Sequence, residues 1–547
     1  MIFGKFPSEF SPATRCPRMT VHSIDSGSRL ISLTQARIRV FLGLISFLAV
    51  IGRSQAIDAA EHIAASDAKS ASAEERQSVT HHSLSLKGKP LNYQATAGTL
   101  TLRDESGHPI ASMFYAAYTA TDILQGSHRP ITFLFNGGPG TASYFLHLGS
   151  FGPVRIATDS PAATHNPPYV AAPNEFTLLD QTDLVFLDAI GTGYSRALGE
   201  LKDDHFWGAD ADVSAFSKGI TRFLTISHRW DSPRFLFGES YGTARAAGVV
   251  YALQHLGVQF NGVVLLSSVL NQGIRDESFD RLYISLLPTY AATALYHHKV
   301  QPQGELAPFL NEVRAYAIGP YQRALDQGDL LPASEEDTVA KQLSEYTGLS
   351  TTFLKQNHLR VTVARFRKEL LRTQHRMIGR YDTRVLGIDV DDSGEKPETD
   401  PSSMYVQGAL VGGAIDYIEN VLNYHTEMEY RSYSASAHNN WDWRHLAPGA
   451  VQVAPFPVFA LDLAAAMREN PHLLVLSLNG AYDLATPFFQ TEYDLSHGYV
   501  DSSLRDHLKM RYYPAGHMAY LDNTAIRMMK SDLDLFFQQS VAAIPQG

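Results

Sequence analysis

One serine in the chain has the surroundings that an activated nucleophile requires. The pentapeptide GESYG at residues 238–242 places Ser240 between two glycines. The residues before it are apolar enough for a short buried strand, and the residues after it are good helix formers. Strand, tight turn and helix is the context of a G-x-S-x-G nucleophile elbow. The pattern alone also fits an ordinary glycine-containing turn, so other residues must decide between the two.

A serine hydroxyl becomes a nucleophile when a base takes its proton, and that base needs a carboxylate to orient it. Two candidates follow predicted strands: Asp483 comes after residues 473–478, and His517 comes after residues 508–513. Functional side chains of open α/β sheets stand beyond the carboxyl ends of the strands. We therefore predict Ser240, Asp483 and His517 as catalytic residues, in the chain order of α/β hydrolases. Nearby residues of the same types do not end a predicted strand: His497, His507, Asp462 and Asp494.

A glycine-rich loop provides a further part of the same chemistry. Residues 136–140 read NGGPG and follow an apolar stretch, 130–135, that we predict as a buried strand. Acyl transfer needs backbone N–H donors that stabilise the oxyanion. We expect one donor from Tyr241, directly after the nucleophile, and the other from Gly138, where glycine allows a close approach of the backbone to the substrate.

Taken together, four motifs resemble those of the serine carboxypeptidase family. They are NGGPG at residues 136–140, LDAIGTGYS at residues 187–195, GESYG at residues 238–242 and AGHM at residues 515–518. The resemblance implies that single residues are removed from peptide C-termini through an acyl-enzyme. It also implies that Asn136 and Glu239 bind the carboxylate of the substrate.

A substrate carboxylate beside Glu239 would raise the pKa of that residue, because two like charges resist ionising together. We therefore expect activity on peptide acids to favour acidic pH. The chain departs from the family pattern at four positions. Thr141 stands where a cysteine is usual, and Leu134 stands where an aromatic residue is usual. Ser150 replaces a second acidic residue, and Gly242 replaces an alanine. The departures leave the triad intact and affect the expected substrate preference. An esterase or acyltransferase with the same triad, and a non-catalytic binding protein on the same scaffold, are the alternatives.

The elements that position these residues predict an α/β-hydrolase fold. The first core part spans residues 79–274 and is predicted to begin with short antiparallel strands. Apolar strands then alternate with helices, which predicts a mostly parallel central sheet with both faces covered. Helical periodicity dominates residues 275–448, which we predict as an inserted, mainly helical cap. The alternation returns in a second core part, residues 449–547. Aromatic residues fit either the core or a substrate pocket at four positions: Tyr144, Phe145, Trp441 and Trp443.

Residues 1–56 are predicted to be a leader with a signal peptide. Two arginines precede an apolar run at 40–52, and SQA at 54–56 fits a cleavage site. The run is shorter than a bilayer requires, although an uncleaved anchor and a start at Met19 are alternatives. Residues 57–78 are predicted as a flexible tether. The single cysteine, Cys16, precedes the cleavage site, so the mature protein would lack disulfides. We predict an exported protein, periplasmic or extracellular, without stable membrane insertion.

Composition narrows the range of partners. The formal net charge of −11 gives no support for a nucleic-acid partner. The adjacent histidine pairs at 81–82 and 297–298 lack the spacing that presents two metal ligands on one helix face, so no metal or other cofactor is predicted. The predicted partners are peptide substrates with a free C-terminus.

Overall fold

The computed structural model describes residues 71–121, 129–301 and 305–542. The predicted leader and signal peptide, and the predicted tether up to residue 70, lie outside these ranges. Residues 71–78, which the sequence assigns to the tether, contact the core. The Glu75 carboxylate accepts hydrogen bonds from the Thr101 amide at 2.9 Å and from the Arg222 guanidinium at 2.7 Å. Strand β1 begins directly after this anchor, at Gln77.

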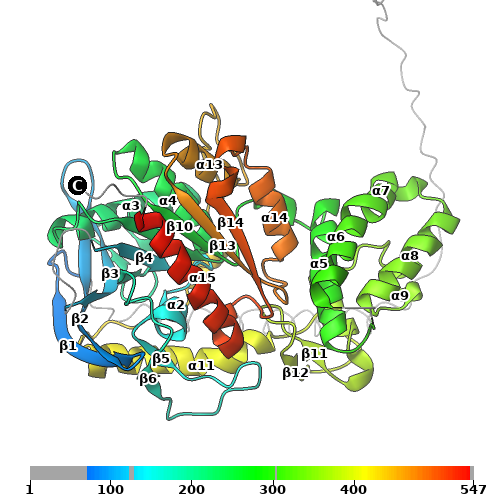
Figure 1. Ribbon diagram of the computed structural model, residues 1–547, viewed down its shortest axis with the longest axis horizontal. Coiled ribbons are helices and arrows are strands. Elements are labelled where there is room, and N and C mark those ends of the chain that lie inside the picture. The colour runs from blue at the N-terminus through cyan, green and yellow to red at the C-terminus, as the bar shows by residue number, and fades with distance from the viewer. Residues whose placement is uncertain (1–70, 122–128, 302–304, 543–547) are drawn as a thin grey trace, which may run out of the picture. The chain divides into compact units, whose positions relative to one another are not determined.

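A ten-stranded sheet forms the centre of the fold, in the order β1-β2-β3-β7-β4-β9-β10-β13-β14, with β8 paired to β3 (Figure 1). The first three strands and β7 pair antiparallel, and all pairs from β7 through β14 are parallel. This arrangement confirms the predicted fold class. The strands of this sheet are β1 Gln77–Leu86, β2 Lys89–Arg103, β3 Pro109–Ala120, β4 Ile131–Phe135, β7 Asp183–Leu187, β8 Arg196–Ala197, β9 Arg234–Glu239, β10 Gly262–Leu266, β13 Leu474–Gly480 and β14 Leu508–Tyr513. Two small sheets pair β5 Val154–Ile156 with β6 Ala171–Pro173, and β11 Met377–Ile378 with β12 Leu386–Gly387.

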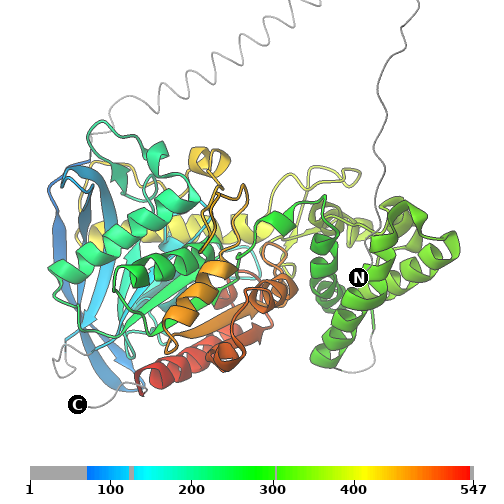
Figure 2. The ribbon, with the colours of Figure 1, turned by 90° about the horizontal axis from the view of Figure 1, so that it is seen from above.

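Helices cover both faces of the central sheet (Figure 2). One face carries α3 Ala209–Ile226, α4 Tyr241–His255 and α13 Ala460–Glu469. The other face carries α2 Tyr144–Leu146, which continues into the π-helix His147–Phe151, together with α11 Pro401–Asp416 and α15 Asn523–Ala542. The remaining α-helices are α5 Asp280–Tyr296, α6 Leu306–Tyr316, α7 Gln322–Gln327, α8 Ala333–Thr347, α9 Thr351–Gln356, α10 Val363–Glu369, α12 Ala435–Asn439 and α14 Phe488–Ser496.

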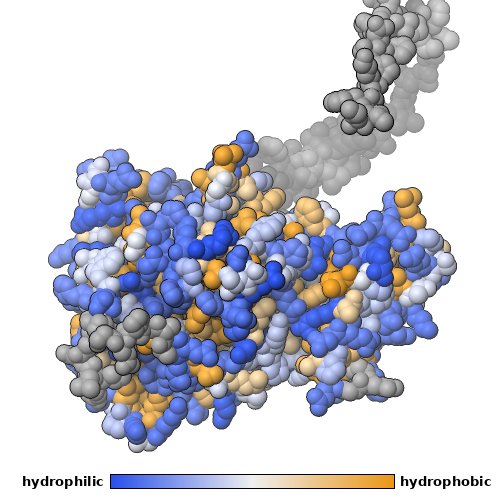
Figure 3. All heavy atoms as spheres, turned by 45° about the horizontal axis from the view of Figure 1, so that its top comes forward, coloured by the Kyte–Doolittle hydropathy of each residue, from blue (hydrophilic) through white to orange (hydrophobic). Residues whose placement is uncertain are grey.

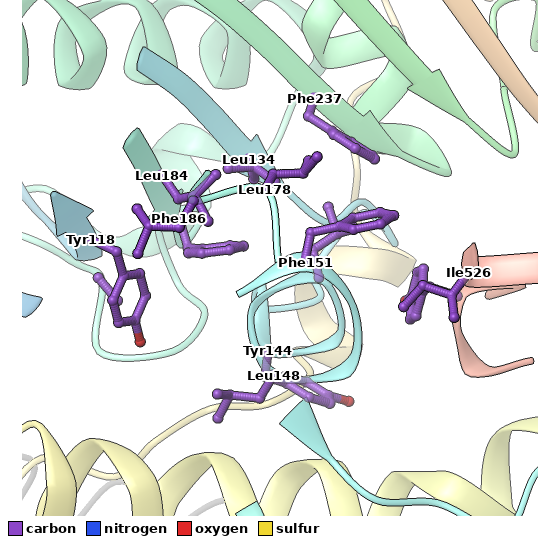
Figure 4. Packing of buried hydrophobic residues seen from close by; sticks show 14 of the residues in the cluster. Tyr118, Leu134, Tyr144, Leu148, Phe151, Leu178, Leu184, Phe186, Phe237 and Ile526 are labelled. Carbon is purple, nitrogen blue, oxygen red and sulfur yellow. The ribbon is translucent and has the colours of Figure 1, made fainter. Parts of the chain in front are cut away.

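The core beneath the predicted glycine-rich loop is built from rings and branched side chains of several elements (Figure 4). Phe186 of β7 and Phe237 of β9 lie against the π-helix through His147 and Phe151, with ring centroids 4.6 Å and 5.7 Å apart. Ile526 of α15 belongs to the same buried cluster. These apolar strand residues are buried on both faces of the sheet, which explains their continuous hydrophobic runs in the sequence.

The predicted insertion, residues 275–448, is divided between hydrophobic clusters. Helices α5 to α10 share one cluster, which also includes Tyr482 and Phe488 of the second core part. Helix α11 contributes Leu410 and Ala414 to the cluster under the central sheet, together with Tyr417 directly after it. The later part of the insertion therefore packs as part of the α/β core.

On the face shown in Figure 3, hydrophilic residues prevail and hydrophobic ones form small separate groups. Within the described residues, every helix is too short or too polar to span a bilayer.

Candidate active site

The turn around Ser240 has the geometry of a nucleophile elbow. Ser240 joins β9 to α4 with φ 59° and ψ −129°, a strained conformation for a non-glycine residue. Its amide donates to the Leu266 carbonyl at 2.9 Å, which ties the turn to the end of β10. A Cβ on Gly238 would lie 2.0 Å from the Gly242 oxygen, and a Cβ on Gly242 would lie 2.7 Å from the Phe135 oxygen. Both glycines are therefore required by close backbone contacts.

The structure brings Asp483 and His517 together. His517 Nδ1 donates to Asp483 Oδ2 at 2.7 Å, and both side chains are buried. The other oxygen of the aspartate accepts the backbone amides of Ala485 and Thr486 at 2.7 Å and 2.9 Å. The Thr486 hydroxyl donates to the same oxygen as the imidazole, at 2.5 Å. Ser240 and His517 line one cavity, so the three residues predicted from the sequence converge at one place.

The two predicted oxyanion donors come from adjoining loops. A Cβ on Gly137 would lie 2.4 Å from the Tyr241 nitrogen, so the NGGPG loop contacts the start of α4 directly. Gly138 has a φ of +105°, which favours glycine, and it lines the cavity with Ser240. Gly138 thus lines the cavity together with Ser240, and the loop that carries it lies against Tyr241, the first residue of α4.

Glu239 is buried beside the serine and belongs to a hydrogen-bonded group. Asn136 Nδ2 donates to its Oε2 at 2.7 Å, and the Tyr520 hydroxyl donates to both oxygens at 3.0 Å and 2.9 Å. Burial raises the pKa of the Glu239 carboxyl to about 7, against the lowering effects of a charged His517 and of these two hydrogen bonds. The carboxyl therefore changes its charge near neutral pH, inside a cavity that contains the candidate nucleophile.

Asn136 is itself fixed from two sides. Its Oδ1 accepts the Leu146 amide at 2.9 Å, and its backbone carbonyl accepts a hydrogen bond of 2.5 Å from Arg245. Arg245 is fully buried and forms an ion pair with Asp212 of α3 at 2.7 Å. Our sequence reasoning missed this pair, although an arginine inside the otherwise apolar run of α4 is a signal of a buried charge that needs a partner.

The cavity has a volume of about 350 Å³. Core elements and the predicted insertion both contribute to its lining: Asn136, Gly137, Gly138, Thr141, Tyr144, Phe145, Glu239, Ser240, Arg380, Tyr381, Ser403, Gln407, Tyr433, His438, His517 and Met518. Of the aromatic residues that fitted either core or pocket, Tyr144 and Phe145 line the cavity. Trp441 and Trp443 instead pack edge-on against the ring of Tyr241, with ring centroids 5.3 Å and 5.7 Å from its centroid.

Ser150, which stands where a second acidic residue is usual, does not replace that residue. Its hydroxyl donates to the Leu146 carbonyl at 2.5 Å within its own helical turn. The second partner of Glu239 is Tyr520, three residues after His517. Sequence reasoning missed Tyr520, because nothing in the motif around it indicates which carboxylate its hydroxyl reaches.

With this geometry in view, comparison with known proteins finds a family model that matches part of the chain. Residues 86–284 match the family model for serine carboxypeptidases. The match contains the NGGPG loop, the GTGYS turn and Ser240, and it ends before Asp483 and His517. The chain is a serine hydrolase with an α/β-hydrolase fold. A search of curated proteins finds no match for this serine hydrolase.

Among solved structures, one aligns closely enough to support this fold. The prohormone-processing carboxypeptidase Kex1(Δ)p from Saccharomyces cerevisiae aligns with a TM-score of 0.50 at 14% identity, covering 82% of this chain and 91% of that one. Proline iminopeptidase from Mycobacterium smegmatis aligns with a TM-score of 0.34 at 14% identity, over 82% and 99% of the two chains. A thermostable carboxyl esterase from Bacillus coagulans aligns with a TM-score of 0.32 at 12% identity, over 81% and 98%. At such low identities the likeness to Kex1(Δ)p concerns the fold of this serine hydrolase.

Proposed function

We propose that the chain is a serine-type carboxypeptidase that removes C-terminal residues from peptides through an acyl-enzyme. The observation that carries this proposal is Glu239, a buried carboxyl with a pKa of about 7 that lines the same cavity as Ser240. While protonated, it can donate a hydrogen bond to a substrate carboxylate, and the amide of Asn136 can donate another. A neutral donor pair next to the nucleophile suits a substrate whose scissile bond lies one residue from a free carboxylate.

In the proposed reaction, the Ser240 hydroxyl attacks the scissile carbonyl carbon while His517 takes its proton. Asp483 orients the imidazole and stabilises its charged form. The oxyanion receives hydrogen bonds from the Gly138 and Tyr241 amides. His517 then gives its proton to the leaving amine as the peptide bond breaks. A water molecule hydrolyses the acyl-serine by the same steps, and the shortened peptide leaves.

We further propose that the insertion at 275–448 acts as a cap over the site, since it contributes Arg380 and Tyr381 to the cavity lining, although its helix α11 packs with the core. The signal-like pattern in residues 1–56 supports export to the periplasm or the exterior, with cleavage after Ala56. Intact mass and N-terminal sequencing of the exported protein test this point. A protein that is found only in the cytoplasm with residues 1–56 attached would contradict it.

The decisive assay compares three substrates at pH 5 and 7.5: an N-blocked dipeptide, its C-terminal amide and a short aryl ester. We expect release of the last residue from the free acid and much slower release from the amide. Ser240→Ala should abolish turnover and labelling by a fluorophosphonate, because both need the activated hydroxyl. Ser334→Ala, which changes an exposed serine of α8, is the matched control and should behave as wild type.

Two outcomes would change the assignment. Hydrolysis of the aryl ester alone would keep the triad and make the protein an esterase or acyltransferase, without a carboxylate-binding role for Glu239. Absence of fluorophosphonate labelling on the folded wild-type chain would contradict catalysis by Ser240 altogether.

A further inference from the structure

Arg380 brings a guanidinium to the active-site cavity. It lines the cavity together with Ser240, Glu239 and His517, and its side chain is exposed to solvent. Its guanidinium carbon lies 5.3 Å from the centroid of the Tyr381 ring, and that ring lies 5.0 Å from the ring of His517. A permanent positive charge therefore stands one aromatic ring away from the proposed general base.

No carboxylate within the described ranges forms an ion pair with this guanidinium, in contrast to that of Arg384. Arg384 is held by Asp382 at 2.7 Å and by Asp522 at 2.8 Å. The nearby carboxylate of Asp400 accepts the backbone amide of Arg380 at 3.0 Å instead of its side chain. The side chain of Arg380 thus retains its capacity for a bidentate partner.

The backbone that carries Arg380 is fixed to the proposed catalytic loops. Its carbonyl accepts the amide of Leu484, next to Asp483, at 3.0 Å. The carbonyl of Tyr381 accepts the amide of His517 at 2.6 Å. Because the backbone is already ordered, a ligand that binds the guanidinium has to immobilise only one side chain.

We propose that Arg380 binds a carboxylate of the substrate, from an acidic side chain next to the scissile bond or from the C-terminus. This inference rests on the proposed function and adds to it a second group that binds a substrate carboxylate. Guanidinium and carboxylate match in geometry, and a partly exposed arginine loses little hydration on binding. The other cavity-lining groups that can carry charge are Glu239, His438 and His517, so a substrate carboxylate near Arg380 meets one acidic neighbour, which is neutral below its pKa of about 7.

The test uses N-blocked dipeptides that contain glutamate or glutamine. One series places this residue at the C-terminal position, and a second series places it at the position before. Each peptide is tested as the free acid and as the C-terminal amide. We expect wild type to prefer glutamate over glutamine roughly two- to five-fold in kcat/KM, the size of an exposed charge-assisted contact. Arg380→Gln should remove the preference and Arg380→Glu should reverse it. High salt should weaken the wild-type preference by screening. Arg376→Gln, which removes an exposed arginine that does not line the cavity, is the charge-matched control and should leave the ratio unchanged.

The substrate arms distinguish the two sources of the carboxylate. A change of the glutamate-to-glutamine ratio in Arg380→Gln assigns Arg380 to an acidic side chain. A change confined to the acid-to-amide ratio assigns it to the C-terminus. Unchanged ratios of both kinds, with peptide hydrolysis intact, would overturn the inference while leaving the proposed function in place.

A binding measurement keeps the inference testable without turnover. Calorimetry would measure the affinity of N-acetyl-glutamate and N-acetyl-glutamine for Ser240→Ala protein with and without Arg380→Gln. We expect the second change to weaken glutamate binding roughly two- to five-fold and to leave glutamine binding less affected. Equal losses for both ligands would assign the contact to the C-terminal carboxylate that they share. No loss for either ligand would contradict a carboxylate contact even if no peptide is hydrolysed.

Discussion

Replacing Glu239 by glutamine should change the pH dependence of the enzyme and not only its rate. Glutamine keeps the size of the side chain and can still donate to a substrate carboxylate, but it cannot ionise. In wild type, burial places the pKa of this carboxyl at about 7. Above that pH the cavity would present a carboxylate to a carboxylate, which opposes binding of a peptide acid.

The size of the effect follows from the pKa. With a value of about 7, roughly nine tenths of the carboxyl is protonated at pH 6 and roughly one tenth at pH 8. The kcat/KM of wild type on peptide acids should therefore fall about ten-fold between these pH values. Glu239→Gln should lack this decline. Neither protein should show it on a C-terminal amide or an aryl ester, which carry no negative charge at that place.

The assay is a pH profile of kcat/KM for wild type, Glu239→Gln and a control, Asp494→Asn. Asp494 is a second buried carboxyl with a pKa raised to about 7 by burial, but it does not line the cavity. We expect the control to keep the alkaline decline. A flat wild-type profile on peptide acids, or an unchanged decline in Glu239→Gln, would refute the reasoning.

The same pKa makes a prediction about stability. The folded-state pKa of Glu239 lies above its ordinary value of 4.5, so the folded protein binds this proton more tightly than the unfolded chain. Stability then falls as the pH rises from about 4.5 through 7, by up to about 3 kcal/mol for a shift of this size. Glu239→Gln should lose less stability than wild type between pH 5 and 8, as measured by chemical denaturation. A constant stability difference across that range would indicate that the carboxyl has an ordinary pKa.

Three further substitutions test the surrounding network. Gly242→Ala would push a methyl group to 2.7 Å from the Phe135 oxygen and should cost about 1–3 kcal/mol by denaturation, whereas a change below 0.5 kcal/mol would contradict this close contact. Thr486→Val removes the hydroxyl bond to Asp483 and should lower kcat roughly ten-fold with little change in KM; an effect on KM alone would contradict a positioning role. Tyr520→Phe removes a hydrogen bond that lowers the pKa of the Glu239 carboxyl, so the alkaline decline of kcat/KM should move to higher pH. A move of this decline to lower pH would contradict the role of the hydrogen bond.

Much of the scaffold could be predicted from the sequence, because its determinants are local. The continuous apolar runs of β4, β7 and β10 are typical of strands that are buried on both faces. The glycines on either side of Ser240 indicate a turn that admits no side chain there. Asp483 and His517 could be placed because each follows a recognisable strand and strand ends converge at one edge of a sheet.

The contacts that tune the site could not be predicted, because they join residues far apart in the chain. Tyr520 reaches Glu239 across 281 positions, and Arg245 reaches the Asn136 carbonyl across 109. Such pairs depend on how loops and helices pack, and no periodicity in either segment encodes them. The contact of residues 71–78 with the core also depends on a distant residue, because the Glu75 carboxylate forms an ion pair with Arg222 of α3.

The segment at 380–384 shows why an insertion between the two core parts is compatible with one active site. Its carbonyls accept the amides of Leu484 and His517, and the Thr383 amide donates to the Tyr482 carbonyl at 3.0 Å. A Cβ on Gly516 would lie 2.3 Å from the Tyr381 oxygen, so this approach depends on glycine just before His517. The loops that carry Asp483 and His517 are thus joined through a segment of the insertion. The insertion therefore helps to hold Asp483 and His517 in position, and its Arg380 adds a positive charge to the lining of the cavity.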